Sequence, residues 1–184
     1  MTTYCEYVLT HPEDSLNKGY HDKEYGFPLD DDNLLFERFV FEINQAGLSW
    51  ITILKKADHF RRAYDGFDIS KVAAYTEADR ERLLADSGII RNHLKVNAAI
   101  ENARRILEFR KDYGSFKGWL DAHHPLDLPG WASLFKKTFV FTGGEIVREF
   151  LVSTGYLAGA HDSDCPIYPQ VAALFPGWMD AESH

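Results

Sequence analysis

The chain has 184 residues, of which 45% are hydrophobic and 26% are charged, a balance typical of a water-soluble globular protein. Its formal net charge of −8 argues against a general polyanion-binding protein, although a local basic face can still position phosphates. The N-terminus lacks the features of a signal peptide, no apolar run approaches the ~20 residues that span a membrane, and two cysteines are too few for a disulfide scaffold. We therefore expect a cytoplasmic protein without membrane association, folded as one domain over residues 1–184 or as two small helical lobes.

The first third of the chain combines an irregular start with two predicted helices. Residues 1–30 are polar and aromatic and are interrupted by prolines and glycines, so we expect them to be irregular. The run Asp30-Asp31-Asp32 offers N-cap residues for a helix that extends to about Gln45. After a tight turn at Gly47, Ser49 is placed to cap a second helix that runs to about Tyr64.

The middle of the chain predicts three more helices. A short helix covers residues 69–75, and the capping-box pattern Thr76-Glu77-Ala78-Asp79 begins another that includes Leu83 and Leu84. Asn92 can cap the longest helix, which ends at about Tyr113 because Gly114 follows it. Apolar residues recur along this helix with the spacing of a single buried face.

The last third predicts shorter helices. Residues 115–138 form short helices separated by Pro125 and Pro129-Gly130, and a further helix covers residues 145–153. The tail from Gly155 is expected to be mostly irregular. Since no run alternates apolar and polar residues long enough to form a strand, the sequence predicts an all-α protein.

One carboxylate in the first long helix is unusual. Glu42 shares a helical stripe with the apolar residues Leu35 and Phe39, in a helix that is apolar around most of its circumference. A carboxylate inside such a helix costs several kcal/mol, roughly, unless something pairs with it. Either a nearby cation neutralises it, or it is available to a ligand. The candidate cations are Arg38, Arg61 and Arg62.

The segment between Leu83 and Ala103 has the form helix, glycine-containing hairpin, helix. Such a hairpin can aim backbone amides at a DNA phosphate, and Gly88 would allow close approach. Arg91 and Lys95, together with His93, add charge beside it. An ordinary helix–helix turn explains the same pattern, so both interpretations stay open.

Two histidines and the two cysteines have spacings compatible with a metal site. His161-x-x-x-Cys165 can supply two ligands of one zinc, and Cys5 and His21 can supply two more if the chain ends meet. Such a four-ligand site would be closed and therefore structural. Among eight histidines the pattern can also arise by chance.

Aromatic residues make up 14% of the chain, and several are near the turn at Gly47 and the N-terminus. Aromatic side chains usually fill cores. Alternatively, Tyr7, Tyr20, Tyr25 and Trp50 could hold a flat, cationic ligand by stacking and cation–π attraction.

Taken together, these segments resemble the DNA-3-methyladenine glycosylase I family of the helix-hairpin-helix superfamily. The most specific block is Gln45–Lys56 (QAGLSWITILKK), supported by Tyr20–Gly26 (YHDKEYG) and by Gly88–Arg91 with Lys95. The resemblance is close from Cys5 to about Asn102 and weaker beyond it.

The resemblance implies roles for named residues. It implies that Glu42 is the catalytic, base-reading carboxylate, and that Gly47 and Leu48 form a turn that probes the gap left by an extruded nucleotide. It implies DNA contacts at the Gly88 hairpin, including Arg91 and Lys95. The implied base pocket consists of Tyr20, Trp50, Tyr25 and Tyr7, the last two at positions that the family usually fills with Trp. The implied structural zinc ligands are Cys5, His21, His161 and Cys165.

The implied activity is hydrolysis of the N-glycosidic bond of 3-methyladenine in alkylated double-stranded DNA after nucleotide extrusion. We expect a monomer with zinc and no organic cofactor. Many helix-hairpin-helix glycosylases use a separate catalytic Asp well after the hairpin, with a Lys in those that also cut the strand. Asp112 is the only Asp at a plausible distance here and is near a surface helix end, so we expect a monofunctional enzyme. A catalytically weakened protein that binds lesions or DNA structure is the alternative. A zinc-dependent hydrolase is disfavoured, because four protein ligands leave no position open for water.

Two segments depart from the family pattern. Phe141-Thr142-Gly143-Gly144-Glu145 differs from the Gly-[Pro/Thr]-Thr segment of the family, and Arg148-Glu149 replaces small or apolar residues. If these residues line the pocket, the range of excised lesions differs from that of the family.

Overall fold

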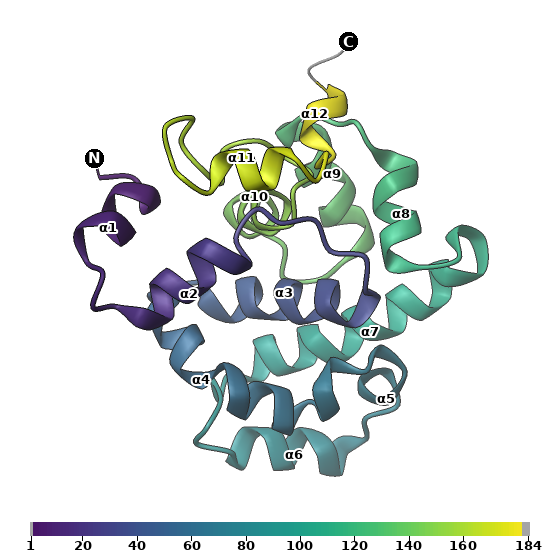
Figure 1. Ribbon diagram of the computed structural model, residues 1–184. Coiled ribbons are helices and arrows are strands. Elements are labelled where there is room, and N and C mark those ends of the chain that lie inside the picture. The colour runs from purple at the N-terminus through teal and green to yellow at the C-terminus, as the bar shows by residue number, and fades with distance from the viewer. Residues whose placement is uncertain (1, 182–184) are drawn as a thin grey trace.

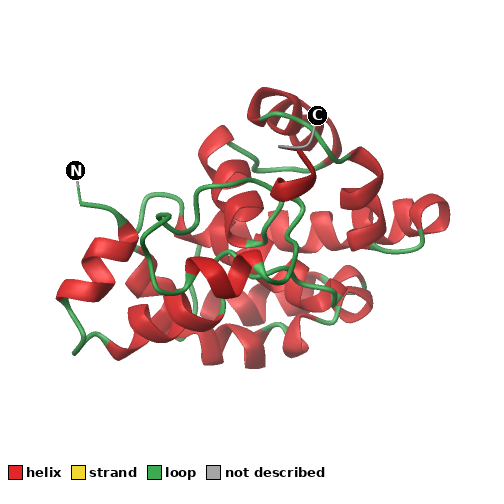
Figure 2. Ribbon diagram, turned by 45° about the horizontal axis from the view of Figure 1, so that its top comes forward, coloured by secondary structure: helices red, strands yellow, loops and turns green. Residues whose placement is uncertain are grey.

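The computed structural model describes residues 2–181, and over these residues it contains helices and loops without a strand. Figure 2 shows the same composition, which confirms the predicted all-α fold. No helix in this part of the chain combines the length and the apolar character needed to cross a membrane. In chain order the elements are α1 (Tyr4–Thr10), α2 (Ser15–Lys23), α3 (Asp32–Gln45), α4 (Trp50–Ala63), the 3₁₀ turn η1 (Asp65–Phe67), α5 (Ile69–Ala73), α6 (Glu77–Ala85), α7 (His93–Tyr113), α8 (Phe116–His123), α9 (Leu128–Thr138), α10 (Gly144–Ser153), α11 (Tyr168–Ala172) and α12 (Trp178–Ala181).

Helix α3 lies in the middle of the molecule and contacts α4, α5, α7, α8 and α10 (Figure 1). Asp31 caps its N-terminus by accepting hydrogen bonds from two backbone amides, as the run of three aspartates predicts. Every residue from Leu35 to Asn44 is buried. An almost uniformly apolar helix is stable only when other elements cover all of its faces, and here they do.

The main core is built from aromatic rings around Phe39. Its ring centroid lies 5.0 Å from that of Phe139 and 5.2 Å from that of Phe150, so α3 packs directly against α10 and the segment after α9. Phe116 stacks on Phe150 with parallel planes. One contiguous apolar cluster runs from α3 to α10, and a smaller one surrounds Cys5 and Cys165. The division of the chain into one domain or two lobes stays a prediction.

Two stretches of the N-terminal segment, residues 4–10 and 15–23, are helical where we expected an irregular chain. Helix α1 begins with a reciprocal capping box between Thr3 and Glu6, and Asp14 caps α2. The signal was present as Thr-x-x-Glu, but glycines and prolines nearby obscured it. Pro129 also does not separate helices as expected, because it lies in the first turn of α9, where its missing N–H needs no partner.

The other predicted helices are confirmed to within a few residues. Thr76 and Asp79 form the predicted capping box, and Asn92 caps α7, which ends at Gly114. Ser49 is the N-cap residue of α4, but its hydroxyl bonds the Thr52 hydroxyl instead of a backbone amide. The tail is mostly irregular as predicted, with the short helices α11 and α12.

The packing around Phe39 generates a stability prediction. Phe39 is fully buried, and its replacement by alanine leaves a cavity among four aromatic rings. Phe39→Ala should lower the free energy of unfolding by about 3–5 kcal/mol, measured by urea denaturation. Leu34→Ala, in the same helix but 49% exposed, is the control and should change it by less than ~1 kcal/mol. A loss below ~1 kcal/mol for Phe39→Ala would contradict this packing.

Candidate functional site

A cavity of about 340 Å³ opens where the N-terminal helices meet α3, α4 and α10. Its volume falls in the range of small-molecule sites. Half of the eight lining residues are aromatic, and three of the other four are carboxylates. The lining residues are Tyr4, Tyr20, Tyr25, Glu42, Gln45, Trp50, Glu145 and Glu149.

The aromatic walls carry polar groups that have no hydrogen-bond partner among residues 2–181. Tyr20 is central: its ring centroid lies 4.9 Å from Trp50 and 5.6 Å from Tyr25. The Tyr20 hydroxyl and the Trp50 indole nitrogen Nε1 are buried and make no hydrogen bond. Buried polar atoms in native proteins are usually paired, so two unpaired donors in one cavity indicate a place for a ligand.

Glu42 is buried in the same pocket, with 3% of its surface exposed, and no hydrogen bond or ion pair reaches its carboxylate from residues 2–181. Burial raises the pKa of Glu42 to about 8, an effect that Arg38 opposes and that Glu149 and Glu145 reinforce. The carboxyl group is therefore mostly protonated at neutral pH. A positive charge in the pocket would lower the pKa of Glu42 and favour its ionised form.

The cations proposed as partners of Glu42 are engaged elsewhere. Arg38 bonds Glu24 and the Ser153 carbonyl, and its guanidinium lies 4.8 Å from the centroid of the Tyr20 ring. Arg61 forms a salt bridge with Glu37, and Arg62 is exposed on α4. None of the three arginines therefore forms an ion pair with Glu42.

Helix α10 brings two further carboxylates to the pocket, at the positions that depart from the family pattern. The Tyr25 hydroxyl donates a hydrogen bond of 3.3 Å to Glu149 Oε2, and Arg148 pairs with the other oxygen, Oε1. Burial raises the pKa of Glu149, while Arg148 lowers it. Glu145 is mostly exposed and lies 3.6 Å from Arg148.

Tyr7, expected in the pocket, lies outside it. Its hydroxyl donates to the Asp14 carboxylate, and its ring stacks on His11. Tyr4, three residues earlier on α1, lines the cavity instead and contacts Tyr25 edge to face. In a helix, residues 4 and 7 lie on adjacent turns, and the packing of the helix decides which of them faces the pocket. Because we expected this segment to be irregular, we could not predict which tyrosine lines the cavity.

The turn after α3 is compact and exposed. Gly47 has a φ of +79°, which favours glycine, and nothing lies within 4 Å of the place where a Cβ would be. Gln45 bonds the Leu48 backbone through both its carbonyl and its side-chain amide. The Leu48 side chain is 39% exposed. The loop is thus closed on itself and presents an apolar side chain to solvent beside the pocket.

The residues of the hairpin between α6 and α7 that we predicted to contact DNA differ in their exposure to solvent. Arg91 is exposed, as a phosphate contact requires. A Cβ on Gly88 would come within 2.6 Å of the His59 ring, so this glycine allows α4 to pack closely. Lys95 is 6% exposed, and its ammonium group donates to the carbonyls of Asn44 and Ala46 at 2.8 and 2.7 Å. Lys95 therefore joins the hairpin helix to the C-terminal end of α3.

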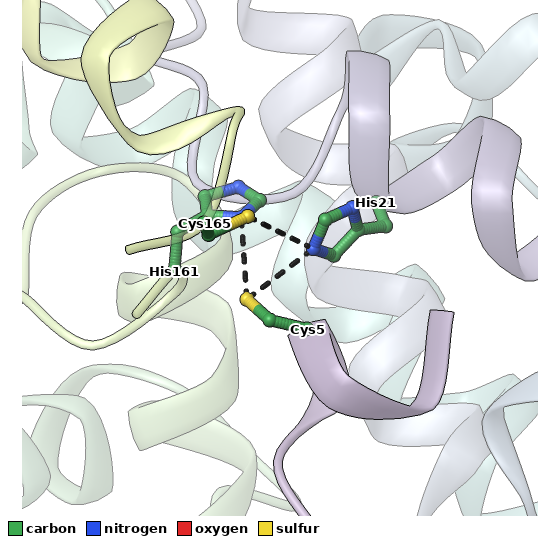
Figure 3. Close-up of side chains that lie close together, drawn as sticks. All are labelled: Cys5, His21, His161 and Cys165. Atoms are coloured by element: carbon green, nitrogen blue, oxygen red, sulfur yellow. Dashed lines mark hydrogen bonds between the residues drawn. The ribbon is translucent and has the colours of Figure 1, made fainter. Parts of the chain in front are cut away.

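The four predicted metal ligands converge from both ends of the chain (Figure 3). All four are buried, and their ligand atoms lie within 4.8 Å of one another. The sulfur-to-nitrogen distances are 3.3–3.8 Å. A tetrahedral zinc with bonds of about 2.0–2.3 Å separates its ligand atoms by roughly 3.3–3.8 Å. The set Cys5, His21, His161 and Cys165 could therefore hold a metal ion.

The outer nitrogens of both histidines are also held. His21 Nδ1 donates to the Asp22 carboxylate at 2.8 Å, and His161 Nε2 donates to the Tyr25 carbonyl at 2.7 Å. Such partners orient metal-binding imidazoles and fix which nitrogen faces the ion. The backbone amide of Asp162 additionally donates to the Cys5 sulfur at 3.4 Å.

Comparison with known proteins places these features in context. The sequence pattern of the methyladenine glycosylase family matches residues 10–126. A DNA-3-methyladenine glycosylase of Haemophilus influenzae is 37% identical over 90% of this chain and 98% of its own length. DNA-3-methyladenine glycosylase 1 of Escherichia coli is 38% identical over 85% of this chain and 94% of its own length.

Solved structures show the same likeness. A Tyr-to-Phe variant of 3-methyladenine DNA glycosylase I, crystallised with 3-methyladenine, superposes with a TM-score of 0.78 at 31% identity and covers 84% of this chain and 93% of that one. A 3-methyladenine DNA glycosylase I from Staphylococcus aureus gives a TM-score of 0.77 at 31% identity, with 84% of this chain and 92% of that one covered.

The raised pKa of Glu42 predicts how stability depends on pH. The unfolded chain loses this proton near pH 4.3, whereas the folded protein keeps it up to about pH 8. Between these values the unfolded state binds fewer protons, so this residue makes the protein less stable as pH rises. Glu42→Gln removes the effect. Relative to wild type, the variant should gain about 3 kcal/mol between pH 5 and pH 7.5, measured by urea denaturation. An equal difference at both pH values would contradict the burial of an uncompensated carboxyl group.

Proposed function

The chain belongs to the methyladenine glycosylase family, and we propose that it hydrolyses the N-glycosidic bond of 3-methyladenine in alkylated DNA. The observation that carries the proposal is the buried Glu42 carboxyl, which has no partner and faces aromatic walls with two unpaired donors. A pocket for a neutral hydrocarbon would not contain it. A flat cation with hydrogen-bonding edges would use every one of these groups.

The chemistry follows from the charge of the lesion. Alkylation at N3 makes the base cationic in the nucleotide, so it is already a good leaving group. Tyr20, Tyr25 and Trp50 favour the cation over neutral adenine. Glu42, ionised by the nearby positive charge, accepts hydrogen bonds from the base and stabilises its charge. The C1′–N bond breaks with its electron pair moving to the base, and water adds to C1′ and loses a proton.

Access to the pocket requires that the nucleotide leaves the DNA stack. We assign the exposed Leu48 on the Gly47 turn to the space that the nucleotide vacates, and Arg91 to a phosphate beside the hairpin. Lys95, with its ammonium group buried, holds the turn relative to the hairpin instead of contacting phosphate. The net charge of −8 implies weak, strongly salt-dependent binding to damaged double-stranded DNA.

The enzyme is proposed to be monofunctional, cleaving the glycosidic bond but not the strand. Cleavage of the strand needs an amine near C1′ of the sugar, and no lysine lines the pocket among the described residues. Asp112 is exposed on the last turn of α7 and is not among the pocket residues. We propose that the protein acts as a monomer in the cytoplasm, where its two buried, unbridged cysteines suit reducing conditions.

Zinc is the metal we propose for the Cys5, His21, His161 and Cys165 cluster. Two sulfurs and two imidazole nitrogens at these separations are typical of a closed structural zinc site. When bound, the ion cross-links the two ends of the chain and takes no part in catalysis. Two of its ligands, Cys5 and His21, directly follow the pocket residues Tyr4 and Tyr20 in sequence, so the ion would fix these walls of the base pocket.

Base release tests the proposed activity. Purified protein should release 3-methyladenine from methylated duplex DNA, and Glu42→Gln should slow the release by about 10²–10³-fold, because it removes the stabilising charge. The measurement is chromatographic quantification of the free base in single-turnover conditions. Glu108→Gln, an exposed carboxylate on α7, is the matched control and should behave as wild type. Tight binding of abasic DNA without base release would instead favour a lesion-binding protein that has lost catalysis.

Metal analysis tests the zinc assignment. The purified protein should contain about one equivalent of zinc, and Cys165→Ser should reduce the content and lower the melting temperature, since structural zinc contributes directly to folding. Asp164→Ser, one residue away on the same loop and outside the ligand set, is the control. Well under one equivalent of zinc in the wild-type protein would refute the assignment.

A further inference from the structure

Helix α10 gives the base pocket a second, partly buried carboxylate that the proposed reaction does not require. Glu149 lines the same cavity as Glu42, but it comes from a different helix, and its side chain is 25% exposed. The two carboxylates lie close enough for the charge of Glu149 to contribute to the raised pKa of Glu42. The pocket therefore offers acceptors from two helices.

The two oxygens of Glu149 have different environments. Oε1 forms the ion pair with Arg148, which opposes the effect of burial on the pKa of Glu149 and orients its carboxyl group. Oε2 accepts only the bond from the Tyr25 hydroxyl, and 3.3 Å is long for a bond between a hydroxyl and a carboxylate. Because a carboxylate oxygen has more than one acceptor position, Oε2 is available to a donor on a ligand.

We propose that Glu149 is a second base-reading residue, which extends the range of the pocket to N7-alkylated guanine. The inference rests on the proposed glycosylase function and names an additional substrate class for the same site. Alkylation at N7 makes guanine cationic in the nucleotide, so the base suits the aromatic walls and the negative pocket as N3-alkylated adenine does.

The hydrogen-bonding groups of the two purines distinguish them. Adenine carries one exocyclic amino group, which a single carboxylate can satisfy. Guanine carries three donor hydrogens on one edge, one at N1 and two at the N2 amino group. One ionised carboxylate accepts from N1 and from one N2 hydrogen, and Glu149 Oε2 can accept from the other N2 hydrogen. An alkyl group at N7 leaves this edge free, whereas one at N3 lies beside the amino group. Two carboxylates therefore suit N7-alkylated guanine better than one.

Guanine also introduces an acceptor, O6, that needs a donor. The Tyr20 hydroxyl and the Trp50 indole nitrogen are buried donors without a partner in the same pocket. Either group can serve O6, so neither edge of the base is left unpaired. The pairing of O6 affects binding because a buried polar group without a hydrogen-bond partner costs about 1–3 kcal/mol.

Base release from one substrate tests the inference. Methylated duplex DNA containing both 3-methyladenine and 7-methylguanine is incubated with the protein, and the two free bases are separated and quantified. Wild type should release both. Glu149→Gln removes the charge and gives the side chain a donor, so it should reduce 7-methylguanine release at least tenfold more than it reduces 3-methyladenine release.

Controls separate specificity from folding. Glu149→Ser removes the carboxylate with a smaller side chain and should give the same change in the ratio of the two bases, while Glu108→Gln on the exposed face of α7 should not change it. Melting temperatures verify that each variant is folded. Release of 3-methyladenine alone by wild type, or an equal loss of both bases in the Glu149 variants, would overturn the inference. Release of neither base by wild type would overturn the proposed function itself.

Discussion

The burial of Glu42 without a counter-ion is the constraint on which the other features of the pocket depend. Glu42 reaches solvent only through the pocket and is 3% exposed, and the nearby Arg38 is held by Glu24 and Ser153. A charged carboxylate would be too costly there in the empty pocket, so the group is neutral until a cation arrives. Selectivity for a positively charged base then follows from the protein interior itself.

The metal cluster and the pocket form one unit. Cys5 follows Tyr4, His21 follows Tyr20, and the His161 ring donates to the Tyr25 carbonyl. Each tyrosine of the pocket wall is thus attached to a member of the cluster. The cluster lies outside the cavity, but the proposed zinc would hold the two short N-terminal helices, which carry Tyr4 and Tyr20, against the C-terminal segment. Lys95 gives comparable support to the turn after α3.

Much of this arrangement could be predicted from local sequence signals. The sequence predicted the buried helix α3, the Asn92 cap of α7 and the convergence of the Cys/His residues, because each of these depends on residue spacing within the chain. The helical N-terminus and the choice of Tyr4 over Tyr7 could not be predicted in this way, since both depend on how α1 packs. Lys95 was expected to contact phosphate, because nothing in its local sequence indicates that it is buried against α3.

The protonation state of Glu42 in the empty pocket tests the central claim most directly. Infrared difference spectroscopy between wild type and Glu42→Gln resolves a protonated carboxyl group from a carboxylate. At pH 6.5 we expect a protonated-carboxyl band that is present only in wild type, disappears above about pH 8 and is lost when an N-methylated purine cation binds. A carboxylate band from Glu42 at pH 6.5 in the empty protein would contradict it.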